Sequence, residues 1–173
     1  EKIRDYITIE KRRIFKNPSL FYCYISTKLV KYKYRFLQTK EHYKEREQMI
    51  IAVANQKGGV GKTTTSQAMA AGLAEKGYRV LGIDLDPQGN FSAACGAESY
   101  NVPTIYEVMK RDSSIEDALQ HMKGGYDVVP ANIMLAGAEQ ELSQTGKEHR
   151  LKEAVAPIAG NYDFIVIDTP PSL

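Results

Sequence analysis

Cysteine, histidine and long apolar runs are all scarce in this chain of 173 residues. Its two cysteines, Cys23 and Cys95, lie far apart, and its three histidines are isolated from one another. Metal and iron–sulfur centres built on cysteine or histidine need these ligands in clusters, so this distribution argues against such centres and suits a reducing cytosol. No apolar run approaches the roughly 20 residues that cross a bilayer, so no membrane-spanning segment is expected.

Glycine and alanine are both absent from residues 1–48, where average usage would place roughly three glycines alone. The same stretch carries 13 Lys or Arg against 6 Asp or Glu, whereas residues 49–173 carry 10 against 15. The net charges are therefore +7 and −5, and the change of character falls at Met49. The sequence predicts two segments, a basic and aromatic extension over 1–48 and part of one globular domain over 49–173.

Two interpretations of the extension are open. Met49 stands directly before the first apolar strand, and the composition favours residues 1–48 being upstream sequence translated in frame, or a disordered segment. The alternative is a genuine arm. Cations and aromatic rings alternate over residues 31–36, which would place the rings on one face of an extended chain. Such a face suits single-stranded nucleic acid or an anionic membrane surface.

Residues 55–64 read NQKGGVGKTT and carry the strongest signal. An apolar run over 50–54 predicts a strand before them, and the pattern over 62–76 predicts a helix after them. A strand, a glycine-rich loop and a helix in this order bind phosphate through backbone N–H groups and the helix N-terminus. We expect Lys62 to reach the terminal phosphates and the Thr63 hydroxyl to bind Mg²⁺. A dinucleotide-binding motif is excluded, because Thr64 stands where its third glycine or alanine belongs.

Two further segments place acids at the ends of apolar strands. A strand predicted over 80–83 leads into Asp84 and Asp86, whose side chains alternation sends to the same side. A strand predicted over 162–167 ends at Asp168. Open α/β sheets bind ligands at the carboxyl ends of their strands, so these three acids are candidates for handling metal and water.

The stretch between these two strands contains helix-capping patterns, and we assign no chemistry to it. Thr104 with Glu107 forms a capping pattern for a helix, and Ser114 with Asp117 repeats it. The elements expected here are a helix over 115–121, a strand over 126–130 and helices over 135–142 and 147–159.

The phosphate loop departs from the general pattern, which would carry glycine at position 56, because this chain has Gln56 followed by Lys57. This deviant loop, the string DLDPQGN over 84–90 and the string DTPPSL over 168–173 resemble the ParA/Soj family of partition ATPases. The resemblance covers residues 49–173. It implies an α/β, three-layer P-loop NTPase fold with a mostly parallel sheet, whose C-terminal part is missing from this chain.

The resemblance also implies residue roles, with ATP and Mg²⁺ as cofactors. Lys57 would contact the nucleotide bound by a partner molecule, and Asp86 would orient the attacking water, so that Lys57, Lys62 and Asp86 are catalytic. Thr63, Asp84 and Asp168 would serve the metal. The nucleotide would be bound by Lys57, Gly58, Gly59, Val60, Gly61, Lys62, Thr63 and Thr64.

The function implied is partition of a chromosome or plasmid by a cytoplasmic, nucleoid-associated ATPase. Its partners would be a second copy in the ATP state, nonspecific DNA and a ParB-like centromere-binding protein, and no membrane is expected. Two alternatives are a MinD-like membrane-cycling ATPase for division-site placement, whose usual string differs from DLDPQGN, and an inactive fragment.

Overall fold

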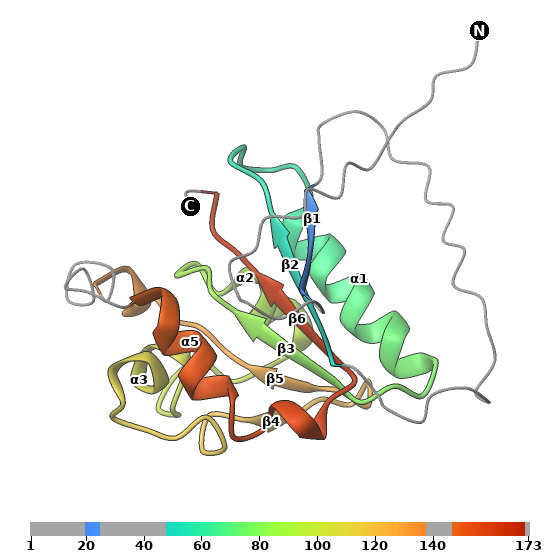
Figure 1. The fold of residues 1–173 in the computed structure, drawn as a ribbon. Coiled ribbons are helices and arrows are strands. Elements are labelled where there is room, and N and C mark those ends of the chain that lie inside the picture. Colours follow the sequence, from blue (N-terminus) through green and yellow to red (C-terminus); the bar gives the residue numbers. More distant parts are fainter. Residues whose placement is uncertain (1–19, 25–47, 138–146, 172–173) are drawn as a thin grey trace, which may run out of the picture.

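The computed structural model of the chain describes residues 20–24, 48–137 and 147–171. Its centre is a six-stranded sheet of order β1-β2-β6-β3-β5-β4 (Figure 1). Every neighbouring pair is parallel except β4 with β5, which confirms the mostly parallel sheet that was predicted. The strands are β1 (Leu20–Tyr24), β2 (Met49–Ala54), β3 (Val80–Asp84), β4 (Gln120–His121), β5 (Asp127–Val129) and β6 (Phe164–Asp168).

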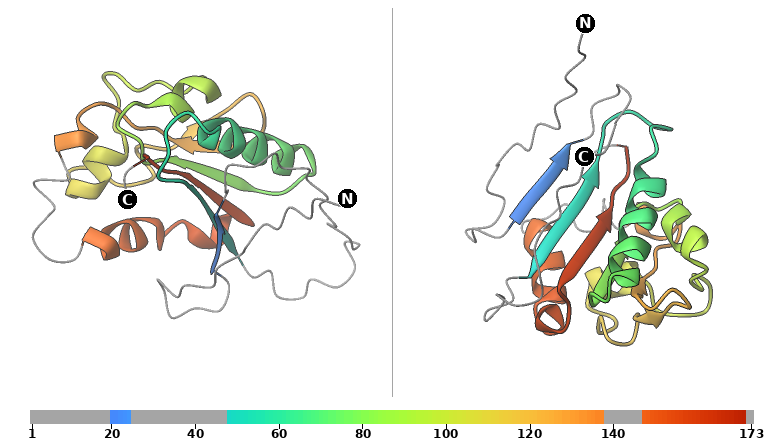
Figure 2. Two further views of the ribbon diagram at one scale, coloured as in Figure 1. Left: turned by 90° about the horizontal axis from the view of Figure 1, so that it is seen from above. Right: turned by 90° about the vertical axis from the view of Figure 1, so that its right-hand side faces the viewer.

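Helices cover both faces of the sheet, which gives the three layers expected of the fold. One layer holds α1 (Lys62–Glu75) and α2 (Asn90–Cys95). The other holds α3 (Ile105–Lys110), α5 (Lys147–Val155) and the short 3₁₀ turn η1 (Ala159–Asn161). Figure 2 shows α1 and α5 on opposite sides of the strands.

Alternation along β3 explains how one strand serves both layers. Leu81 and Ile83 belong to the core that includes α3 and α5, whereas Val80 belongs to the core under α1 and α2. All five residues of β3 are buried, as expected of a parallel strand covered on both faces. Since side chains alternate, Asp84 shares the side of Val80 and Gly82 and lies toward α1 and α2.

The register of the sheet brings the carboxyl ends of the central strands together. Asp84 of β3 is the partner of Asp168 of β6, and Asp168 is also the partner of Val53 in β2. At the opposite end, the Asp163 carboxylate accepts hydrogen bonds from the Arg79 backbone N–H at 2.9 Å and from Arg79 Nη2 at 3.1 Å. These bonds join the starts of β3 and β6 and so help to hold the register.

The predicted helix over 115–121 is wrong. Residues 115–118 form a turn, and Gln120 and His121 pair with β5 as β4. Gly125 has a φ of 77° and closes a tight hairpin, in which the Met122 N–H donates to the Tyr126 carbonyl at 2.8 Å. The hairpin brings these backbone groups to the open edge of β5, and pairing there replaces the helix that the capping pattern favoured.

Two other helix predictions need revision or remain partly untested. The helix predicted over 147–159 ends at Val155, because Pro157 lacks a backbone donor and its ring obstructs a continuing helix. Residues 135–137 are helical, and the rest of the helix predicted over 135–142 lies outside the described residues. The capping box of Thr104 and Glu107 at the start of α3 is confirmed.

The extension contributes β1 at the edge of the sheet, parallel to β2. The rest of residues 1–47 lies outside the described part, so both interpretations of this segment stay predictions. No helix in the described ranges is long and apolar enough to cross a membrane.

The close packing of β3 against α2 yields a stability prediction. A Cβ added at Gly82 would lie 2.6 Å from Cζ of Phe91, a fully buried ring in α2. Gly82→Ala should therefore destabilise the fold by about 1–3 kcal/mol, because the ring must shift in a packed core. Urea unfolding measures this loss.

Gly72→Ala is the matched control for that substitution. Gly72 lies inside α1 and has no atom near the position of an added Cβ. Alanine there should stabilise the helix by roughly 0.5–1 kcal/mol. Equal unfolding free energies for the two variants would contradict the packing argument.

Candidate functional site

The glycine-rich loop joins β2 to α1 and is shaped by one side chain and two glycines. The Asn55 side-chain oxygen accepts a hydrogen bond from the Lys57 N–H at 2.9 Å, which turns the chain as it leaves β2. Gly59 and Gly61 have φ values of 69° and 85°, a region that L side chains rarely adopt. The first turn of α1 then leaves backbone N–H groups without helical partners, which suits an anion.

A pocket of about 490 Å³ lies between this loop and the segment that follows β3. It brings together most of the residues predicted to bind the nucleotide, with Asp86 in the same wall. Lys57 and Val60 are outside its lining. The lining residues are Gly58, Gly59, Gly61, Lys62, Thr63, Thr64, Asp86, Gln88, Asn90 and Pro171.

The two lysines of the loop have opposite surroundings. Lys62 opens α1 and is only 8% exposed, whereas Lys57 is exposed on the loop. Burial raises the pKa of Asp168, and the charge of nearby Lys62 opposes that rise. The Lys62 side chain is thus enclosed in the pocket of its own molecule, whereas the Lys57 side chain is accessible from outside.

Asp168 is fully buried beneath the loop and is held by two hydroxyl groups of α1. The Thr63 Oγ1 donates to one carboxylate oxygen at 2.8 Å, and the Ser66 Oγ donates to the other at 2.7 Å. Two predicted metal residues, Thr63 and Asp168, therefore lie side by side.

Asp84 is also fully buried, and three donors surround it. The Ser92 Oγ and the Ser92 N–H both donate to Oδ2, at 2.7 and 2.9 Å. The Asp86 N–H donates to Oδ1 at 3.0 Å. Asp86 lines the pocket and Asp84 lies behind it, so the two acids that share one sequence string occupy different surroundings.

Burial sets the electrostatics of both acids. It raises the pKa of Asp84 to about 6, although the hydrogen bonds from Ser92 and Asp86 favour the charged form. Burial also raises the pKa of Asp168, against the hydrogen bonds from Ser66 and Thr63. Asp168 repels the charge of Asp84, and Asp86 repels the charge of Asp168, so a nearby cation would stabilise all three carboxylates.

The donor set fits Mg²⁺ bound together with a phosphate. Among the described residues, no three Asp, Glu, His or Cys side chains lie close enough to hold a metal by themselves. Magnesium usually takes one or two protein oxygens and completes its shell with water and phosphate. The neighbouring oxygens of Thr63 and Asp168 meet that need, and Asp84 can act only from behind them.

Ser66 and Ser92 are the site residues that the sequence interpretation missed. Ser66 follows Thr63 by three residues on α1 and so shares its face, a relation that helical periodicity alone could have shown. Ser92 has no comparable local signal, because its partner Asp84 lies eight residues away across a turn.

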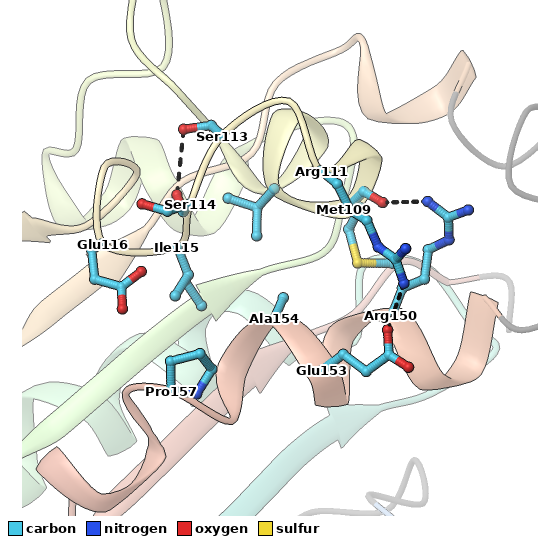
Figure 3. A pocket seen from close by; sticks show the side chains of 11 residues that line it. Met109, Arg111, Ser113, Ser114, Ile115, Glu116, Arg150, Glu153, Ala154 and Pro157 are labelled. Atoms are coloured by element: carbon cyan, nitrogen blue, oxygen red, sulfur yellow. Dashed lines mark hydrogen bonds and ion pairs between the residues drawn. The ribbon is translucent and has the colours of Figure 1, made fainter.

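A second pocket, of about 380 Å³, lies between α3 and α5 on the other face of the sheet (Figure 3). Arg111 Nη2 meets Glu153 Oε2 at 2.8 Å, and Arg150 Nη1 donates to the Met109 carbonyl at 3.0 Å. It contains none of the predicted site residues, and acids and bases both line it. We assign it no ligand.

Comparison with known proteins identifies the family of this chain. Residues 48–173 match the AAA domain family. The sporulation initiation inhibitor protein Soj of Bacillus subtilis is 49% identical over 127 residues, which cover 72% of this chain and 50% of that protein. The chromosome partitioning protein ParA of Myxococcus xanthus is 48% identical, over 72% of this chain and 45% of that protein. The chain thus spans about half the length of these relatives.

A solved structure extends the likeness to three dimensions. The crystal structure of cobyrinic acid a,c-diamide synthase from Mycobacterium smegmatis, with a bound ATP analog and magnesium, has a TM-score of 0.70 to this chain. The two sequences are 44% identical, over 73% of this chain and 52% of that chain.

The raised pKa of Asp84 predicts a pH dependence of stability in the absence of metal and nucleotide. Its folded pKa of about 6 exceeds the ordinary value of 3.8, so the folded state binds more protons between these limits. Rising pH therefore favours unfolding over this window. Asp84→Asn has no proton to lose and should reduce the fall of the melting temperature from pH 4 to pH 6 in EDTA.

Asp112→Asn is the control, since that exposed carboxylate lies near the surface cation Lys110. The slope against pH is the test rather than the absolute melting temperature, because an amide at position 84 brings its own donor toward Ser92. Identical slopes in the wild type and Asp84→Asn would contradict the burial argument.

Proposed function

The chain belongs to the AAA domain family and, within it, to the ParA/Soj partition ATPases, so we propose that the intact protein partitions a chromosome or plasmid by Mg²⁺-dependent, dimerising ATP hydrolysis. The observation that carries the proposal is the pair of lysines on one phosphate loop, with Lys62 buried and Lys57 exposed. A single complete pocket would not need the second lysine, whereas a pocket shared between two copies would.

Within one copy, the residues divide the work of phosphoryl transfer. Lys62 and the first turn of α1, which line the pocket, would bind the phosphates. Thr63 and Asp168, which are hydrogen-bonded to each other, would hold the metal. Bound Mg²⁺ would neutralise the charge that develops on the transferred phosphoryl group. Asp86 stands in the pocket wall, where its Oδ1 accepts the Gln88 N–H at 3.0 Å. In this proposal it would orient the attacking water.

Between two copies, Lys57 would complete the partner's site. A positive residue supplied in trans contributes about 10³–10⁵ in rate in other phosphate-loop enzymes. In a twofold symmetric pair each copy gives its lysine and receives one, so both sites become complete together. ATP would then form part of the interface, and its hydrolysis would release the two copies.

The partners in this proposal follow from the relatives, one of which is named as a chromosome partitioning protein. We propose nonspecific DNA binding in the ATP state, stimulation by a ParB-like centromere-binding protein and a cytoplasmic, nucleoid-associated location. Residues 49–173 carry a net charge of −5. Nonspecific DNA binding relies on positive charge, so we expect the DNA surface in the part of the relatives' length that this chain does not span.

Substituting each loop lysine separates binding from hydrolysis. Lys62→Ala should abolish nucleotide binding, because it removes the buried charge of the pocket. Lys57→Ala should bind ATP normally but fail to dimerise or lose turnover by about 10³-fold or more. Titration with a fluorescent ATP analogue, light scattering and phosphate release measure the three properties.

Lys76→Ala removes an exposed lysine at the end of α1 and serves as the charge-matched control. Wild-type turnover by Lys57→Ala would rule out the role of that lysine in a partner's site.

Mixing two defective variants tests the shared site directly. Asp86→Ala should bind ATP and remain dimeric with only a small residual turnover, because the water is no longer oriented. In a mixed pair, Lys57→Ala keeps its own Asp86 and receives Lys57 from its partner, so one of the two sites is complete. The mixture should regain part of the wild-type phosphate release. If the mixture is no more active than its components, Lys57 does not act in trans.

A further inference from the structure

Ser92 occupies a buried junction behind the nucleotide pocket. It lies in the first turn of α2 and is completely inaccessible to solvent. Its hydroxyl donates to Asp84 Oδ2 at 2.7 Å, and the Ala131 N–H donates to the same hydroxyl at 2.9 Å. Because Ala131 supplies a proton to the Ser92 oxygen, the hydroxyl proton is directed toward Asp84. The direction of this chain of hydrogen bonds is therefore set by the backbone.

This series of hydrogen bonds continues from Asp84 into the pocket. The other oxygen of Asp84 accepts the Asp86 N–H at 3.0 Å, so the carboxylate that Ser92 holds also holds the backbone of Asp86. Asp86 is 8% exposed and lines the pocket, whereas Ser92 does not line it. The hydrogen bonds of Ser92 thus connect it to the pocket through Asp84 and Asp86.

Packing around α2 fixes where Ser92 stands. Phe91, its neighbour in the helix, lies against Gly82 of β3. Gly89 has a φ of 63°, and a Cβ there would lie 3.1 Å from the Ala131 carbonyl oxygen. Ser92 therefore lies where three segments meet: the end of β3, the start of α2 and the segment after β5. A small displacement of any of these segments would shift the Asp84 carboxylate.

We propose that Ser92 is a positioning residue for ATP hydrolysis, which fixes the Asp84 carboxylate and through it the placement of Asp86. This inference rests on the proposed function, in which Asp86 orients the attacking water. A water-orienting group must be held within a fraction of an ångström, and its supporting partners provide that precision. Asp84 accepts three hydrogen bonds from these two residues: two from the hydroxyl and the backbone N–H of Ser92, and one from the backbone N–H of Asp86.

The first test compares substitutions of Ser92 in the full-length protein. Ser92→Ala should lower kcat by about 10- to 100-fold, as losses of supporting hydrogen bonds commonly do at metal sites. ATP affinity should stay at the wild-type value, because Ser92 is not in the pocket wall. Threonine and valine have nearly the same shape and differ in the hydroxyl. The kcat of Ser92→Thr should therefore exceed that of Ser92→Val by about 10- to 100-fold.

Ser114→Ala is the control for loss of a serine–aspartate hydrogen bond. The Ser114 Oγ donates to Asp117 Oδ2 at 2.7 Å, the length of the Ser92 bond, but on the exposed surface. Its kcat should equal that of the wild type. Equal turnover by the Thr and Val variants of Ser92 would show that only the bulk at this position matters, and it would overturn the proposal.

The second test asks whether Ser92 acts through Asp86. Adding Ser92→Ala to Asp86→Ala should cause no further loss of the residual turnover, because the group being positioned is already gone. A purely structural effect would instead multiply the two losses, and this outcome would also overturn the proposal.

The same variants separate this inference from the proposed function. If Asp86→Ala is slow but Ser92→Ala keeps kcat within about twofold of wild type, the proposed function stands and the role of Ser92 is wrong. If Asp86→Ala itself turns over normally, the assignment of Asp86 fails, and the role of Ser92 fails with it.

Discussion

Two carboxylates buried side by side at the carboxyl ends of β3 and β6 are the constraint on which the rest of the site depends. Asp84 and Asp168 are register partners, and both are fully inaccessible to solvent. Removing such groups from water is unfavourable, and hydroxyl donors from Ser66, Thr63 and Ser92 offset the penalty only in part, as the raised pKa values of both acids show. The excess negative charge favours a cation at the edge of the pocket, where a phosphate would bring one.

The parity of the strands determines which helices serve these acids. Each acid is the last residue of its strand and points to the face that α1 and α2 cover. The hydroxyl groups therefore come from those helices and not from α3 or α5. The contact of Phe91 with Gly82 holds α2 close enough for Ser92 to reach Asp84. Core packing therefore controls the geometry of the site, because a shift of α2 would move the Ser92 hydroxyl away from Asp84.

One loop also separates two lysines by burial. The Asn55 turn leaves Lys57 exposed, and the start of α1 buries Lys62 beneath the glycines. At the far side of β2, β1 pairs with the strand that carries this loop and covers an edge that would otherwise present unpaired backbone groups. The strand that carries the loop is thus flanked by β1 on one side and by β6 on the other.

The sequence alone determined the features that contiguous residues encode. The strand, loop and helix around residues 55–64, the strands ending in Asp84 and Asp168 and the family were all readable, because each rests on local spacing. The helix predicted over 115–121 failed because pairing with β5 overrode a local cap. Only the tertiary structure decided the hydroxyl partners, the raised pKa values and the burial of Lys62. These depend on contacts such as Ser66 with Asp168, 102 residues apart, which no local pattern specifies.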